Sequence, residues 1–231
     1  MLQEPCSWNM KIEDFRSRFQ SFREIDYKTY PYCFGEFWKW KLRTETENEH
    51  ILDARHIEET HKKLGETLKR WRWGRPYKHA ELAERLRRAL ENIRNAYDQI
   101  RNYSLLEFNR IPDEPLKLIW HELGCVKTKE EKSRSGYYLI MGITKPLMLL
   151  WGQTPAFDSV VRAKMPKFGI PRLTDYYWDF IAWKTVLTKF QEGLKQQPEV
   201  IQVFKEVSRE EYGSDSIISY GQFLDLYYWT K

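Results

Sequence analysis

The chain has 231 residues and a mass of 28.1 kDa, enough for one large domain or two small ones with a core of their own. Hydrophobic residues make up 42% and charged residues 31%, with a mean hydropathy of −0.70. This composition excludes a membrane-embedded or a disordered chain. The aromatic fraction of 16% is high for so polar a protein, so most rings must lie in a core and the others can line a site.

The formal net charge of +5 conceals an uneven distribution. Residues 61–102 contain twelve basic and five acidic side chains, an excess of seven that exceeds the net charge of the whole chain. Such a segment attracts phosphate backbones or other polyanions, because the local potential governs encounter. The alternative is a solvated helix face joined by ion pairs such as Glu81–Arg85 and Glu84–Arg88.

The first half of the chain predicts three helices. Apolar residues at helical spacing predict a helix over 11–25, and residues 36–41 alternate between apolar and charged side chains, which fits either a short strand or a helix edge. A long helix is predicted over 51–73 and a second over 77–102, where the apolar stripe is continuous. Because Gly74-Arg75-Pro76 separates these two, we expect an antiparallel helical hairpin.

The second half predicts further helices separated by proline and glycine. Asp113 and Pro115 favour a helix over 115–123, and Thr144-Lys145-Pro146 restarts a helix that Gly152 ends. Asp158 can cap 159–165, and Thr174 or Asp175 can cap an aromatic-rich helix that reaches about residue 195. Helices opened by Pro198 and Ser219 follow, and no strand pair is predicted.

These elements predict an all-α, single-domain protein with a long antiparallel helical hairpin. Within residues 1–231 we distinguish a candidate N-terminal appendage (1–50), the basic hairpin (51–102) and a helical core (113–231).

Common catalytic and metal-binding signatures are absent from the sequence. His56 and His61 are five residues apart and point away from each other on a helix, so no metal site and no cofactor are predicted. The three cysteines, Cys6, Cys33 and Cys125, form no CxxC pair, and we expect no histidine at metal-ligand distance from any of them. With no secretory signal visible at the amino terminus, the odd cysteine count fits a reducing cytoplasm, and no membrane association is expected.

The segment 142–162 carries the most specific pattern. Gly142-Ile143 precedes Lys145, and a proline-containing turn delivers Asp158 to the start of the next helix. This pattern resembles the helix-hairpin-helix DNA glycosylase superfamily, although Thr144 stands where that family has its second hairpin glycine. The resemblance implies phosphate binding at Gly142 and base-excision chemistry at Lys145 and Asp158. The segments 119–124 and 145–152 also resemble uncharacterised bacterial proteins, a likeness that implies no function.

Each candidate residue also has a purely structural interpretation. Asp158 needs only to cap a helix. Lys145 at a helix start opposes the helix dipole, which favours a buried Lys–Asp pair, catalytic or not. Six rings can stack on bases or belong to the core: Trp71, Trp73, Tyr77, Tyr176, Tyr177 and Trp178.

The sequence therefore supports two main hypotheses. The first is a DNA-binding protein with base-excision-type activity, in which Lys145 and Asp158 are catalytic. Its candidate nucleic-acid contacts are Arg70, Arg72, Arg75, Lys78, Gly142, Arg162 and Lys164. The second is a non-enzymatic helical module that binds an acidic protein or forms an oligomer. A small-molecule enzyme with an aromatic pocket is a third class for which no residue set is nominated.

Overall fold

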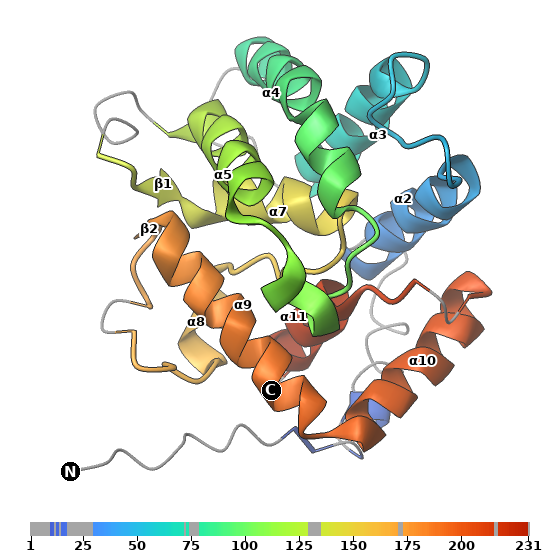
Figure 1. Ribbon diagram of the computed structural model, residues 1–231, viewed down its shortest axis with the longest axis vertical. Coiled ribbons are helices and arrows are strands. Elements are labelled where there is room, and N and C mark those ends of the chain that lie inside the picture. Colours follow the sequence, from blue (N-terminus) through green and yellow to red (C-terminus); the bar gives the residue numbers. More distant parts are fainter. Residues whose placement is uncertain are drawn as a thin grey trace.

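The helical architecture predicted from the sequence is confirmed in the computed structural model (Figure 1). The model describes residues 10–11, 13, 15–17, 30–71, 73, 79–128, 135–170, 173–214 and 217–230. Its helices are α2 (Tyr30–Thr44), α3 (Ile57–Arg70), α4 (His79–Ile100), the 3-10 helix η1 (Leu105–Arg110), α5 (Asp113–Lys127), α7 (Ile140–Leu150), α8 (Ser159–Lys164), α9 (Phe180–Lys195), α10 (Pro198–Tyr212) and α11 (Tyr220–Thr230). Most of the helix predicted over 11–25 lies outside these ranges.

The predicted hairpin is formed by α3 and α4, which run antiparallel. His61 Nε2 lies 2.9 Å from the backbone oxygen of Ala83, and Arg87 donates to Glu58 across 3.0 Å. Glu58 lies about one turn before His61 on α3, whereas its partner Arg87 lies about one turn after Ala83 on α4, as antiparallel helices require. The connection at Gly74-Arg75-Pro76 lies outside the described residues. The opposite side of α4 packs most extensively on α5, which places three helices side by side (Figure 1).

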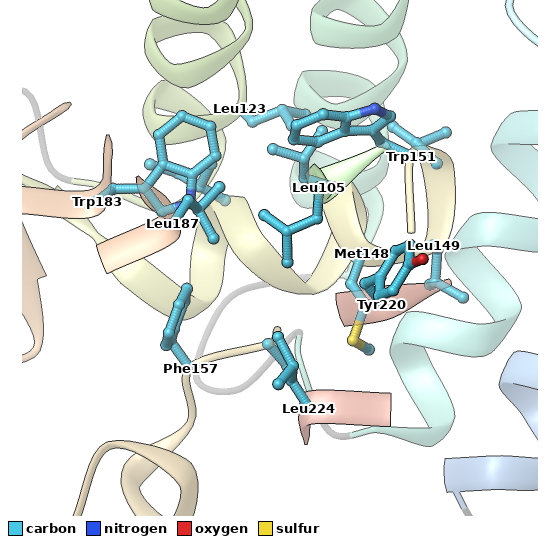
Figure 2. Close-up of a cluster of buried hydrophobic side chains, with 14 of the residues drawn as sticks. Leu105, Leu123, Met148, Leu149, Trp151, Phe157, Trp183, Leu187, Tyr220 and Leu224 are labelled. Carbon is cyan, nitrogen blue, oxygen red and sulfur yellow. The ribbon is translucent and has the colours of Figure 1, made fainter. Parts of the chain in front are cut away.

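The centre of the molecule is an apolar cluster around α7. Figure 2 shows side chains from η1, α5, α7, α9 and α11 converging there, with Trp151 and Trp183 as its largest members. Trp183 stacks on Trp120 with ring centroids 5.1 Å apart, and Phe108 meets Trp183 edge-on at 5.9 Å. Trp120, Trp151, Trp183 and Phe190 are all buried, so burial explains much of the aromatic excess.

Residues 36–41, whose pattern left strand and helix open, belong to α2. One face of α2 is buried: it carries Phe34 and Trp38, four residues apart, and Phe37 and Lys41, also four residues apart. Gly152 lies against the ring of Trp38 with a positive φ of 77°, and an added Cβ would collide with that ring. The described part of residues 1–50 is thus packed into the same core.

One short antiparallel ribbon departs from the sequence prediction. Strand β1 (Tyr138–Leu139) pairs with β2 (Tyr177–Trp178), with Tyr138 opposite Trp178 and Leu139 opposite Tyr177. The prediction that Thr174 or Asp175 caps the following helix is wrong, because α9 begins at Phe180 and Asp179 caps it by accepting from the backbone N–H of Ala182. Helix α5 likewise begins at Asp113 itself.

None of the helices in the described part of the chain is long and apolar enough to cross a membrane.

Candidate functional site

Lys145 projects from α7 towards the carboxyl end of α3. The side chain is half-buried, and its Nζ lies 3.4 Å from the backbone oxygen of Trp71, the residue that caps α3. The last carbonyl groups of a helix lack intrahelical partners and attract cations. This contact gives Lys145 a structural reason to lie here, whether or not it takes part in chemistry.

The charges of Lys145 and Asp158 influence each other, but within the described residues the two side chains form no direct ion pair, and the polar contact of Lys145 is with Trp71. Burial lowers the pKa of Lys145, and the nearby carboxylates of Asp158 and Asp225 act in the opposite direction. A larger fraction of the amine is therefore neutral at a given pH than for a lysine in water. The charges of two carboxylates thus act on a partly desolvated amine whose direct polar contact is the backbone oxygen of Trp71.

Asp158 caps α8, as one of its two interpretations predicted. Its Oδ1 accepts from the backbone N–H groups of Val160 and Val161, each across 2.9 Å, and its Oδ2 accepts from the indole of Trp229 across 2.7 Å. The preceding residue, Phe157, has a φ of 46°, which non-glycine residues rarely adopt. The turn that delivers Asp158 to this position is held by the surrounding core, since Phe157 is fully buried.

Asp225 was not singled out from the sequence. It lies on α11, is buried, and accepts from the backbone N–H of Ala156 across 2.8 Å. A single acid within the apolar run of residues 223–228 was the signal that could have identified it, because isolated buried carboxylates are rare.

Lys127 is a second lysine beneath the end of α3. It is only 5% exposed, donates to the backbone oxygen of Trp73, and holds its Nζ 5.1 Å from the centroid of the Trp73 ring. Burial, reinforced by the charge of Lys145, lowers the pKa of Lys127 to about 8. Two helices thus direct lysines at one helix terminus.

Gly142 does not form the expected hairpin between two helices. It lies in the first turn of α7, directly after β1, and α7 continues through Pro146 instead of starting at residues 144–146. A Cβ at position 142 would lie 3.3 Å from the Cβ of Lys127. The glycine therefore allows the Lys127 side chain to cross α7 closely, which is a packing role.

Arg162 lies inside the molecule, contrary to the expectation that it contacts nucleic acid. It is 2% exposed, and its Nε donates to the backbone oxygen of Phe157 across 3.0 Å. Its Nη1 donates to the backbone oxygens of Thr174 and Asp175. A guanidinium used in this way cannot bind phosphate without abandoning three backbone carbonyl groups, those of Phe157, Thr174 and Asp175. Lys164, by contrast, is exposed, with Nζ 3.2 Å from the backbone oxygen of Trp229.

The basic segment divides into a paired and an exposed part. On α4, the predicted ion pairs Glu81–Arg85 and Glu84–Arg88 are formed, at 2.6 and 2.9 Å, which confirms the solvated interpretation for this face. On α3, Lys62, Lys69 and Arg70 are exposed, and Arg70 approaches the sulfur of Cys33 at 3.7 Å. The predicted contacts Arg72, Arg75 and Lys78 lie outside the described residues.

The aromatic candidates also divide. Trp71, Trp73 and Trp178 are buried and belong to the core, whereas Tyr176 and Tyr177 are exposed. Tyr77 lies outside the described residues.

A Cys–His contact corrects the sequence analysis. Cys125 Sγ lies 3.8 Å from His121 Nε2, and His121 Nδ1 lies 2.6 Å from the hydroxyl of Tyr138. The four-residue spacing of His121 and Cys125 on α5 was the missed signal. Burial, with the charge of Glu122, raises the pKa of Cys125, so the thiol is not activated as a nucleophile. Within the described ranges, no group of three or more His, Cys, Asp or Glu side chains is arranged to hold a metal ion.

Comparisons with models of protein families, with curated proteins and with solved structures gave no match.

Proposed function

We propose that this protein binds DNA and acts at a base-excision-type site in which Lys145 supplies the reacting amine and Asp158 the carboxylate. The observation that carries the proposal is the partly desolvated Lys145 amine at the end of α3, on which the charges of Asp158 and Asp225 act. The likeness to helix-hairpin-helix DNA glycosylases supports the proposal only at Lys145 and at the proline-containing turn before Asp158, because Gly142 lies within α7 and forms no hairpin.

The chemistry suits an aldehyde such as C1′ of a ring-opened abasic sugar. The neutral amine of Lys145 attacks the carbonyl carbon, a proton moves from nitrogen to oxygen, and loss of water leaves an imine between the lysine and the sugar. Asp158 is positioned to stabilise the positive charge that develops on this nitrogen. Burial favours the neutral amine from which the reaction starts.

The DNA-contacting surface in this proposal is the exposed basic group of α3, Lys62, Lys69 and Arg70. It lies on the helix whose carboxyl end meets Lys145. Phosphate contacts of this kind produce affinity that falls steeply with salt.

A borohydride-trapping experiment tests the chemistry. The full chain is incubated with a duplex that contains one abasic site, and hydride reduction of the imine links protein and DNA covalently. We expect an adduct with the native protein and with K205Q, a matched control at an exposed lysine on α10. We expect no adduct with K145Q and little with D158N. An adduct that persists in K145Q would exclude Lys145 as the amine.

Fluorescence anisotropy with an intact labelled duplex tests binding separately. Replacing Lys62, Lys69 and Arg70 by glutamine should reduce the slope of log affinity against log salt by about 2 to 3. Absence of salt-dependent binding at low ionic strength would remove the DNA proposal altogether.

A second candidate function is a non-enzymatic module for an acidic partner or for self-association. The exposed apolar side chains Leu118 and Ile181 favour it, since such residues support protein contacts. Light scattering over a concentration series tests it. A mass that rises with concentration, together with no DNA binding, would select this function over the first.

A further inference from the structure

A hollow of about 760 Å³ lies where the β1–β2 ribbon meets the start of α9. Its lining includes Tyr137 beside β1, the segment 174–178, and Asp179 and Ala182 at the start of α9. The volume is within the range of sites for small organic ligands. None of the residues assigned to DNA chemistry above lines this hollow.

Three tyrosine rings border the hollow and remain open to solvent. Tyr176, Tyr137 and Tyr177 are 55%, 46% and 40% exposed, in a protein whose large aromatic side chains are otherwise mostly buried. Exposed rings that border one concave surface offer both apolar contact and the negative face of their π systems.

The floor of the hollow is held rigidly. Trp178 is buried, packs on Phe157 with centroids 5.1 Å apart, and donates through its indole to the backbone oxygen of Asp175 across 3.0 Å. From below, Arg162 binds the backbone oxygens of Thr174 and Asp175. The site therefore exists before any ligand arrives, which reduces the entropy lost on binding.

Both charged side chains among the described lining residues are acidic, although the chain as a whole is positive. Asp175 and Asp179 belong to the lining, and none of the described lining residues is basic. Arg162 lies beneath, with its guanidinium carbon 4.6 Å from the centroid of Tyr176. The contact shows that this ring accepts a cation on its inner face, and Arg162 is turned towards backbone carbonyl groups.

From these features we infer that the hollow binds a free organic dication with an apolar spacer, of the diamine or polyamine class. The two carboxylates match two ammonium groups, and the tyrosine rings contact the ammonium groups and the methylene chain between them. A phosphate or a nucleic-acid backbone is disfavoured at this surface, because both ionisable acids repel it. The site is thus distinct from the proposed DNA surface on α3.

Calorimetric titration of putrescine (1,4-diaminobutane) into the full chain at low ionic strength tests this inference. We expect saturable binding of one molecule per chain, no binding of butane-1,4-diol, and binding of butylamine that is weaker by about tenfold because one ammonium group is missing. The double variant D175N/D179N should weaken putrescine binding by about tenfold or more while remaining folded, because asparagine still caps α9.

Matched variants elsewhere on the surface serve as controls. E199Q removes an exposed carboxylate on α10, and Y32A removes an exposed tyrosine ring on α2, both away from the hollow. Both should bind putrescine like the native chain, whereas Y176A should not. Equal binding by D175N/D179N and E199Q, or no binding of any diamine, would overturn the inference. So would N-acetyl-lysine amide binding as tightly as putrescine, since one cation would then suffice.

Discussion

Two buried regions of this protein differ in what holds them together. The cluster in Figure 2 is almost entirely apolar, with Trp151, Trp183 and Phe157 packed among leucines. The neighbouring region around Lys145 buries charged side chains from α5, α7, α8 and α11, among them Lys127, Asp225 and Arg162.

The apolar cluster needs no explanation beyond burial, because removing rings and leucines from water stabilises the fold. The charged region does need one, since desolvating a charge is unfavourable and often exceeds the gain from pairing. Because hydrophobic burial does not explain the charged side chains around Lys145, a function is more to be sought there than in the apolar cluster.

The largest expected effect belongs to the apolar cluster. Trp183→Ala leaves a cavity next to Trp120 and Phe108 and should lower the free energy of unfolding by about 3 to 5 kcal/mol. Denaturant unfolding measures the loss. Leu118→Ala, at an exposed position on α5, is the control and should change stability by less than about 0.5 kcal/mol. A loss near that of the control would mean that Trp183 is not packed as described.

Arg162→Met tests a buried charge whose Nε and Nη1 donate to backbone carbonyl groups. Methionine fills much of the space but leaves the oxygens of Phe157, Thr174 and Asp175 without this donor, so we expect a loss of about 2 to 4 kcal/mol. Denaturant unfolding of the native chain and of the variant measures this loss. An unchanged free energy of unfolding would mean that the fold does not need the hydrogen bonds of Arg162.

Burial of the Lys127 amine should make the free energy of unfolding depend on pH. Its pKa of about 8 in the folded chain lies below the ordinary lysine value of 10.5, so the unfolded chain binds more protons between these values and stability rises with pH across that window. We expect a rise of about 1 to 2 kcal/mol after allowance for solvent screening. Unfolding at pH 7.5 and pH 10 measures it.

Lys127→Met provides the control for this pH effect, because it removes the titrating amine and keeps a chain of similar length. The rise with pH should flatten in the variant. An unchanged rise would assign the effect to other groups.

The smallest stability effect is expected at Asp158. Asp158→Ala removes the cap of α8 and should cost about 1 kcal/mol, whereas Asp158→Asn should cost only a few tenths because asparagine also caps helices. Thermal unfolding separates the two. If Asp158→Asn keeps this stability yet loses the borohydride adduct, the carboxylate serves chemistry as well as capping; retention of both would leave capping as its role.

Local features of the fold were accessible from the sequence. The stripe over 77–102 predicted α4, the spacing of Glu81 and Arg85 predicted their ion pair, and the residues after Pro155 predicted Asp158 as a cap. Each depends on neighbours within one or two helical turns, where periodicity and capping chemistry act directly.

Features that depend on tertiary packing were not accessible. Gly142 and Pro146 discourage a helix locally, yet α7 runs through both because its side chains are almost all buried by other elements. The two-residue strands are too short to show alternation. The guanidinium of Arg162 is held in part by carbonyl groups twelve and thirteen residues away, which no local pattern reveals. The same limit hid Asp225, while Lys145 and Asp158 were nominated because both belong to the one sequence segment 142–162.

The contact between Gly142 and Lys127 has an evolutionary consequence. With hydrogen in place of a side chain at 142, the long side chain at 127 can cross α7 to reach the end of α3. Because the nearest atom is the Cβ of Lys127, which every residue except glycine carries, a side chain at 142 would force α5 and α7 apart whatever residue stands at 127. In descendants or ancestors of this sequence that keep this packing of α5 on α7, position 142 should therefore remain glycine.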